Sequence, residues 1–446
     1  MAIKQQSNKF IQMTTAPVER LICSLAIPSI AIMLTTAFYN MADTYFVGSL
    51  GTSAVGAVGI AFPLMAIIQA MGLFFGQGSG NYISRALGAE ETEGASKMAA
   101  TGFFTALIVM ASLSILGLLN LPSLVRLLGA TETILPYAME YISFILVASP
   151  WMAAAMVLNQ QLRFQGSAVI AMVGMLTGAI LNVFLDPLFI FVFDLGIRGA
   201  AQATMCSQIV SMAILLIGGS KKDNIRIRFK HFSPRLSIYR EMIRGGIPAL
   251  LRQGLMSIST IVINHFAGVY GDAAIAAISI VNRIYILAGS IMFGFGQGFQ
   301  PVCGFNYGAK LYARLKRAFW FCIRLSSAGL LLTSVVFAIF APRIIALFRN
   351  DPEVIRIGAL GLRLHCISLP FTAWLVICNM MTQTIGKALE ASLLSMSRQG
   401  IFLLPALFIL TPLKGLLGIQ LSLPASDIVG FIVAIPLATR VLRQMK

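Results

Sequence analysis

Two carboxylates lie inside long apolar stretches in the first half of the chain. Asp43 is near the end of an apolar segment that runs from Ile22 to Val47, and Asp186 is near the end of another, at 168–193. A charged side chain in a membrane-spanning helix costs about 3 kcal/mol on insertion scales, so it usually has a partner, a cavity or a function. Two such acids close together titrate as a coupled pair, or their oxygens hold a hard cation such as Na⁺. The sequence therefore predicts a proton- or cation-binding site.

Three neutral side chains are expected at the same depth as the two acids. Asn182 is four residues before Asp186, which places both on one helix face. Tyr141 and Thr204 are one or two turns from the ends of neighbouring apolar segments. The predicted site for coupling to H⁺ or a cation consists of Asp43, Tyr141, Asn182, Asp186 and Thr204. A bound Na⁺ would take its oxygen ligands from Asp43, Asn182, Asp186 and Thr204.

Each acid also has a purely structural interpretation. Asp186 directly precedes Pro187, so it is also suited to be the N-cap of a helix that restarts after a proline break. Asp43 is close enough to the end of its segment to reach water at the membrane surface. Both interpretations remain open at the level of the sequence.

The elements that carry these residues are predicted membrane helices. Of the 446 residues, 58% are hydrophobic and only 11% are charged, whereas about a quarter are charged in soluble domains. The apolar runs are continuous and long enough for helices, so we predict an all-α membrane protein with twelve transmembrane helices. The expected spans are 20–47, 53–82, 96–120, 135–160, 168–193, 199–219, 242–267, 272–301, 318–341, 354–381, 390–411 and 418–440.

The chain is an internal repeat. A shift of 220 residues superposes Ile27-Pro28 on Ile247-Pro248, 75-FGQG-78 on 295-FGQG-298, and Asn159 on Asn379. Six spans per half is an even number, so both halves enter the membrane in the same direction, as in parallel-repeat transporters. We expect two pseudo-symmetric six-helix lobes, at 1–219 and 242–446, joined by a basic linker at 220–241.

Basic residues predict the orientation. Lys and Arg gather at the N-terminus, in the loops after every second span, in the linker and at the C-terminus, which explains the net charge of +17. We therefore expect a multi-pass membrane protein with both termini in the cytoplasm. The linker is expected to lie over anionic lipid, and nucleic acid is not an expected partner.

The second half lacks the acids of the first. The repeat partner of Asp43 is Ile263, and that of Asp186 is Ala406, or Pro405 if the register slips earlier. The second-half spans instead carry Arg252, Arg283, Arg363 and Asp427. Arg363 and Asp427 share a predicted depth, so we expect them to pair. The coupling site is therefore predicted in the first half alone.

The remaining motifs are expected to be structural, with one exception. Pro28 and Pro248 lie within the first span of each half, where a proline permits a bend, and Pro28 is a candidate hinge. The FGQG runs suit close helix packing. The six cysteines and three histidines show no ligand or disulfide spacing, so no metal centre or cofactor is expected.

With these residues in view, the chain resembles the MATE (multidrug and toxic compound extrusion) transporters, and it is similar to their MepA-like bacterial branch. The resemblance covers all twelve spans and implies a location in the bacterial inner (plasma) membrane. Its marks are 43-DTYFVG-48, 82-YISRALGA-89, and 181-LNVFLDPLFIF-191 followed by 196-GIRGAAQAT-204. It implies a proton or cation site at the five residues named above, with Pro28 as the bend in the first helix.

The resemblance also implies the activity. It points to a secondary antiporter, not an enzyme, that exports amphipathic or cationic drugs and dyes in exchange for H⁺ or Na⁺ by alternating access of the lobes. The expected partners are drug-like small molecules, the coupling ion and membrane lipids, and the protein is expected to be a monomer. The sodium-coupled branch carries acids on spans 7 and 10, which this chain lacks, so that site is not carried over. The alternatives are a lipid-linked or polysaccharide precursor flippase of the same superfamily, and a membrane scaffold or receptor.

Overall fold

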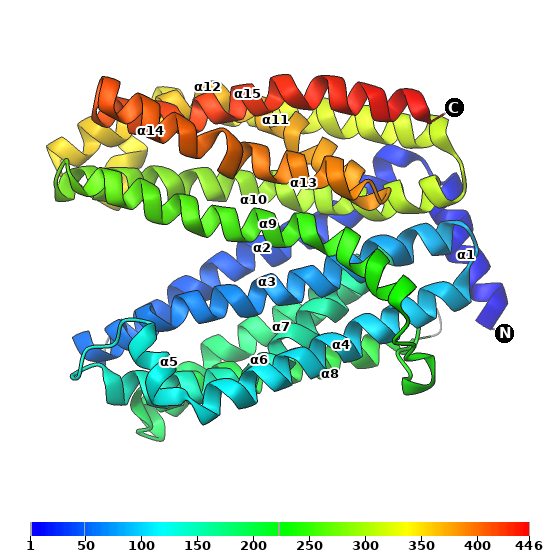
Figure 1. Ribbon diagram of the computed structural model, residues 1–446, viewed down its shortest axis with the longest axis horizontal. Coiled ribbons are helices and arrows are strands. Elements are labelled where there is room, and N and C mark those ends of the chain that lie inside the picture. Colours follow the sequence, from blue (N-terminus) through cyan, green and yellow to red (C-terminus); the bar gives the residue numbers. More distant parts are fainter. Residues whose placement is uncertain (1, 49, 222–223, 446) are drawn as a thin grey trace. The chain divides into compact units, whose positions relative to one another are not determined.

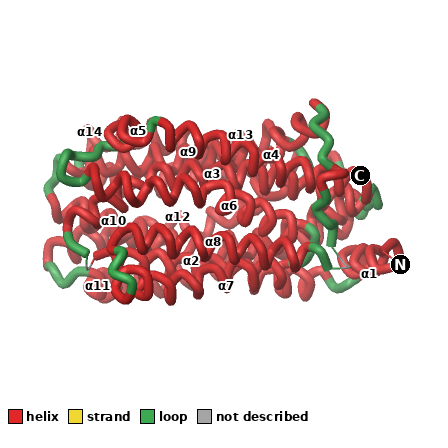
Figure 2. The backbone as a smooth tube through the Cα atoms, turned by 90° about the horizontal axis from the view of Figure 1, so that it is seen from below, coloured by secondary structure: helices red, strands yellow, loops and turns green. Residues whose placement is uncertain are grey.

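The computed structural model describes the backbone of residues 2–48, 50–221 and 224–445, and their side chains except those of 2–8, 37–45 and 52. This part of the chain is built from helices without any strand (Figure 2). Twelve of the described helices are long and apolar enough to cross a membrane. The predicted fold class, an all-α membrane protein with twelve transmembrane helices, is confirmed.

The helices follow one another in two similar series (Figure 1). The first comprises α2 (Val18–Gly48), α3 (Thr52–Gly88), α4 (Thr92–Leu119), α6 (Leu135–Phe164), α7 (Ala168–Pro187) with the π turn η1 (Leu188–Val192), and α8 (Gly196–Gly219). The second comprises α9 (Leu236–Gly268), α10 (Asp272–Gly308), α11 (Tyr312–Phe348), α12 (Pro352–Thr384), α13 (Ala388–Met396) with the π turn η3 (Ser397–Ile401) and α14 (Leu403–Lys414), and α15 (Leu416–Gln444).

Several helices are longer than the predicted spans. α3 continues to Gly88 and α10 to Gly308, where the spans were expected to end at 82 and 301. The N-terminal segment, which has no apolar run, also forms a helix, α1 (Ala2–Thr15). Apolar runs mark only the part of a helix that lipid requires, whereas backbone hydrogen bonding continues into polar sequence at the membrane surface.

Two short helices complete the chain. α5 (Leu121–Leu127) follows α4 and packs beside α6 (Figure 1). The 3₁₀ turn η2 (Phe229–His231) lies in the basic linker and contacts α4. Near the start of the linker, Lys9 Nζ of α1 donates to Ser167 Oγ (2.6 Å) and Asn224 Oδ1 (2.7 Å). The linker is therefore held by specific hydrogen bonds near its start.

The chain divides into two compact units that exchange short segments. Unit 1 consists of Met1–Ala16 and Ala31–Gly246, and unit 2 of Pro17–Ile30 and Ile247–Lys446. The beginning of α2 thus packs within unit 2, and the beginning of α9 within unit 1. These packing units differ from the halves of the repeat, and the two lobes at 1–219 and 242–446 remain a prediction.

The two FGQG runs pack against these exchanged segments. A Cβ on Gly78 would lie 2.3 Å from the carbonyl oxygen of Met242 on α9, within unit 1. A Cβ on Gly298 would lie 2.6 Å from the backbone nitrogen of Ala26 on α2, within unit 2. Only glycine permits such backbone approach, as is common between membrane helices. Their interpretation as packing residues is confirmed.

Candidate ion-coupling site

Three of the predicted site residues form one buried hydrogen-bonded group in unit 1. Asn182 Nδ2 donates to Asp186 Oδ1 at 3.2 Å and to Thr204 Oγ1 at 3.4 Å. Asp186 is 0% exposed, and Asn182 and Thr204 are each 2% exposed. The amide of α7 therefore links the carboxylate one turn later to the hydroxyl of α8. A buried polar group of this kind requires its hydrogen bonds, because desolvation without them is costly.

Local backbone geometry places Asp186 inside a continuous helix. α7 runs through Asp186 and Pro187 directly into the π turn η1, where Phe193 N donates to Leu188 O at 3.0 Å. The carboxylate therefore bonds within its own helix and does not cap a new one, so the N-cap interpretation is wrong. π turns are frequent at functional sites, because they interrupt regular packing.

The start of α8 approaches the π turn closely. A Cβ on Gly199 would lie 2.7 Å from the carbonyl oxygen of Phe189. Only a residue without a side chain allows this approach. The contact fixes the distance between α7 and α8 and so brings Thr204 within reach of Asn182.

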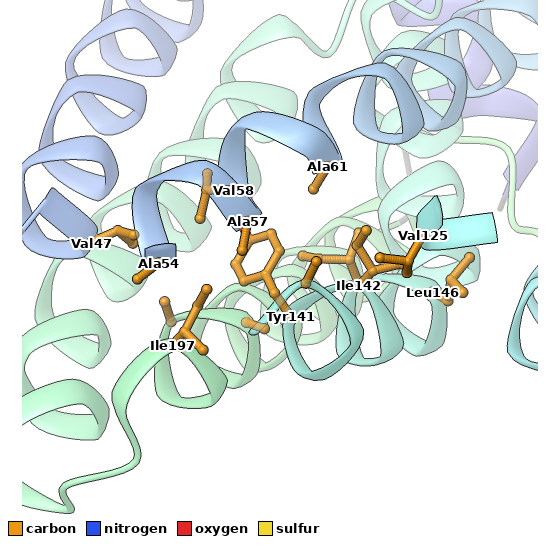
Figure 3. Close-up of a cluster of buried hydrophobic side chains, with 14 of the residues drawn as sticks. Val47, Ala54, Ala57, Val58, Ala61, Val125, Tyr141, Ile142, Leu146 and Ile197 are labelled. Atoms are coloured by element: carbon orange, nitrogen blue, oxygen red, sulfur yellow. The ribbon is translucent and has the colours of Figure 1, made fainter. Parts of the chain in front are cut away.

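Tyr141 lies in a hydrophobic cluster beside this group. Its ring is fully buried and points from α6 toward Ala57 of α3 (Figure 3). The same cluster contains Ile190, one turn after Asp186, and Ala200, one turn before Thr204. Tyr141 and residues of the segments that carry the polar group thus belong to one hydrophobic cluster.

Asp43 lies in the helical backbone of α2, but its side chain is outside the described residues. Farther along α2, Val47 is buried in the cluster that contains Tyr141, and the ring of Phe46 lies 6.5 Å from that of Phe191. The end of α2 therefore packs beside η1. The role of Asp43 remains a prediction from the sequence.

The oxygens of this group suit a proton or a small cation. Asn182 Oδ1 is buried and accepts no hydrogen bond from any described residue. Together with the Asp186 carboxylate and Thr204 Oγ1, it gives three kinds of oxygen at one place, which is the ligand type of hard cations. The described residues contain no group of three His, Cys, Asp or Glu side chains that could hold a metal ion. A coupling ion would therefore rely on amide and hydroxyl oxygens beside the carboxylate.

A second buried polar cluster lies in unit 2. Asp427 on α15 is 0% exposed and accepts hydrogen bonds from Arg398 Nε (2.7 Å), Tyr285 OH (2.8 Å) and Ser368 Oγ (3.1 Å). Arg398 Nη2 also donates to the Tyr285 hydroxyl. The side chains come from η3, α10, α12 and α15. A complete carboxylate–guanidinium network thus occupies the second half.

The expected pairing of Asp427 with Arg363 is wrong. Arg363 is exposed, and its Nε donates to the carbonyl oxygen of Ala338 at 3.1 Å. Equal depth in the membrane does not place two side chains on facing helix surfaces, because the rotation of each helix decides that. The partner of Asp427 is Arg398, which was not predicted from the sequence. An arginine within the predicted span 390–411 is itself a sign of a buried partner.

A family model for MatE matches residues 28–188 and 248–409. The chain belongs to this family. The two matches begin 220 residues apart, at Pro28 and Pro248, so each half of the repeat is one MatE module. The resemblance to MATE transporters seen in the sequence is confirmed.

Relatives of MATE type cover nearly the whole chain. A protein named multidrug export protein MepA from Staphylococcus haemolyticus is 28% identical over 406 residues, covering 91% of this chain and 89% of the relative. MepA from Staphylococcus aureus strain MSSA476 is 29% identical over 415 residues, covering 92% and 90%. A crystal structure of MATE in the bent conformation has a TM-score of 0.92 and 27% identity, covering 98% of both chains.

These similarities establish the general class. The chain is a multi-pass membrane protein of the bacterial plasma membrane and a transporter of the MATE family.

Proposed function

We propose that this chain is a secondary active antiporter that exports amphipathic, often cationic, drugs and dyes in exchange for H⁺ or Na⁺. The observation that carries the proposal is the buried group formed by Asp186, Asn182 and Thr204 in unit 1. Family membership supports transport, and the multidrug export names of the relatives support the drug substrates. In this proposal the protein moves its substrates and does not convert them.

The coupling step is a change in the charge of the acidic pair, Asp43 and Asp186. A proton on one carboxyl, or a Na⁺ held by Asp186, Asn182, Thr204 and Asp43, neutralises negative charge in a water-poor site. A cationic drug binds favourably only while this negative charge is present. Binding of the coupling ion neutralises the same charge. Drug and ion binding therefore exclude each other. Alternating access then exposes each of them to one side of the membrane in turn.

We propose Pro28 as the hinge. A proline within a helix removes one backbone hydrogen bond and permits a bend. Pro28 lies two residues before Ile30, where α2 passes from unit 2 into unit 1. Pro248 has the corresponding place in α9, two residues after unit 1 ends at Gly246. A bend near either proline changes the direction of a helix that belongs to both units.

We also propose how the chain is oriented in the membrane and in which oligomeric state it works. Lys and Arg are clustered at the two termini and in the loops between alternate spans, which supports cytoplasmic termini. The transport unit is proposed to be a monomer, because each chain contains both MatE modules.

The test is dye efflux from proteoliposomes under a pH gradient alone and under a Na⁺ gradient alone. The wild type is expected to export under one of the two gradients, which identifies the coupling ion. Asp186→Asn and Asp43→Asn should reduce this efflux to that of protein-free liposomes. Asp194→Asn, which changes an exposed carboxylate in the turn after η1, is the matched control. Wild-type efflux by Asp186→Asn under the same gradient would show that the coupling group lies elsewhere.

A further inference from the structure

The carboxylate of Asp427 is fully engaged. Its Oδ1 accepts from the guanidinium of Arg398, and its Oδ2 accepts from Tyr285 and Ser368. The pair is buried, with the Asp427 side chain 0% exposed and that of Arg398 11% exposed. One negative and one positive charge thus compensate each other at hydrogen-bond distance. A buried pair of this kind is stable only while both members are present.

The arginine is held in place by its backbone as well as by its side chain. It lies in the π turn η3, where Phe402 N donates to Ser397 O at 3.0 Å. The carbonyl oxygen of Arg398 accepts from Ser426 of α15, and that of Gln399 accepts from Ser259 of α9. The π turn frees backbone carbonyls, and two serines from other helices use them. The position of the guanidinium is therefore built into the fold.

Other titratable or charged side chains face this pair from the surrounding helices. The His365 ring of α12 lies 5.5 Å from the ring of Tyr285 of α10, and its Nδ1 is 2.8 Å from the carbonyl oxygen of Gly361. Arg252 of α9 lies over Phe293 at 5.8 Å and is within electrostatic range of Arg398. Arg398 thus has a second guanidinium, that of Arg252, within electrostatic range, and Asp427 is the carboxylate to which it is bonded. A further cation or proton at Asp427 would leave Arg398 uncompensated in a buried place.

The neighbouring groups would otherwise make a cation site. Tyr285 and Ser368 present hydroxyl oxygens to Asp427, as Thr204 presents one to the group of Asp186. His365, whose ring lies next to that of Tyr285, also lines a cavity of about 30 Å³, together with Asn282 and Gln420 among others. A cavity needs about 10–15 Å³ to hold one water molecule, so this one is large enough. Here the guanidinium of Arg398 takes the place at Asp427 Oδ1 that an exchangeable cation would occupy.

We propose that Arg398 is a built-in counter-cation that keeps Asp427 out of ion coupling, and that removal of its guanidinium turns Asp427 into a second binding site for a monovalent cation, H⁺ or Na⁺. In the wild type, one ion-binding site per chain then remains, the one in unit 1. The consequence for the stoichiometry rests on the proposed ion coupling at Asp186. The binding chemistry at Asp427 does not depend on that proposal.

The experiment measures ion binding to the purified full-length protein. ²²Na⁺ binding and proton uptake in weakly buffered solution are measured in parallel, so that the two ions are distinguished. In an Asp186→Asn background, binding by the unit 1 site should be lost. Arg398→Met in that background should restore about one bound ion per chain, and Asp427→Asn added to it should remove this ion again. Arg398→Lys, which retains the positive charge, should restore none.

Two outcomes would overturn the inference. One is an Asp186→Asn protein, with Arg398 intact, that still binds an ion which Asp427→Asn removes. This measurement needs no Arg398 variant and holds even if Arg398→Met fails to fold. The other is a folded Arg398→Met variant that gains no ion. Failure of the proposed function has a different signature, because Asp186→Asn alone would then leave both ion binding and efflux unchanged.

Discussion

Among the side chains that the structure describes, each half of this MATE protein buries one carboxylate near a π turn, but the two halves surround it differently. Asp186 is bonded to a neutral amide, and Asp427 to a guanidinium. A neutral partner orients a carboxylate without cancelling its charge, whereas a fixed cation cancels it permanently. In our two proposals, one half of a duplicated transporter exchanges ions, and the other half holds a side-chain cation in the place of the ion.

One structural hydrogen bond is, by contrast, the same in both halves. Asn159 Nδ2 donates to the carbonyl oxygen of Ala171 (3.2 Å), and Asn379 Nδ2 to that of Ala391 (2.7 Å). Donor and acceptor are both shifted by 220 residues. This hydrogen bond is therefore retained in both halves, whereas the buried charged groups differ. Each of the following predictions tests this division.

The largest expected effect on stability comes from breaking the ion pair of unit 2. Asp427→Ala leaves the guanidinium of Arg398 buried without its counter-charge, which costs about 3–5 kcal/mol of unfolding free energy. Thermal unfolding in detergent should show a strong decrease in midpoint. Arg363 is exposed and was predicted from the sequence to pair with Asp427. As a control, Arg363→Ala should leave the midpoint almost unchanged.

Removing both members of the pair should be milder than removing one. The double variant Arg398→Met, Asp427→Leu replaces two buried charges with apolar groups, a change that is often neutral. The double variant should therefore unfold at a higher temperature than either single variant. Additive losses would show that the two side chains do not interact energetically.

Asn182→Ala should weaken ion binding without abolishing it. The carboxylate of Asp186 stays, but an amide that orients it and offers a free oxygen is lost, at a cost of about 1.5 kcal/mol or roughly tenfold in affinity. The measurement is the concentration of the coupling ion needed for half-maximal efflux. Ser368→Ala, which removes a hydroxyl from the unit 2 cluster, should leave this concentration at the wild-type value.

The smallest and most symmetric effect is expected for the paired asparagines. Asn159→Ala and Asn379→Ala each remove one buried side chain–backbone hydrogen bond, worth about 1 kcal/mol. Both variants should lower the unfolding midpoint to a similar, small extent and leave the coupling ion unchanged. A selective loss of coupling in one of them would mean that this position also differs between the halves.

The sequence predicted most of the candidate site because helical spacing is regular. Asn182 and Asp186 are one turn apart, and alternation of the spans gave Thr204 the same depth. Prediction from the sequence failed where the rotation of a helix about its axis, or an irregular backbone, decides which side chains meet. Arg363 and Asp427 share a depth but face different surroundings, and the π turn that directs Arg398 toward Asp427 leaves no apolar pattern.

The amino-acid sequence by itself determined the twelve helices, the duplication and the acids of the first half, because hydrophobic length, repeat spacing and isolated charges are local properties. Only the tertiary structure decided which side chains meet. It showed that α7 continues through Asp186 instead of starting anew, that α2 and α9 each belong to both packing units, and that Arg398 compensates Asp427. These facts depend on the rotation of helices about their axes and on close backbone contacts at glycines, which arise only when distant segments pack together.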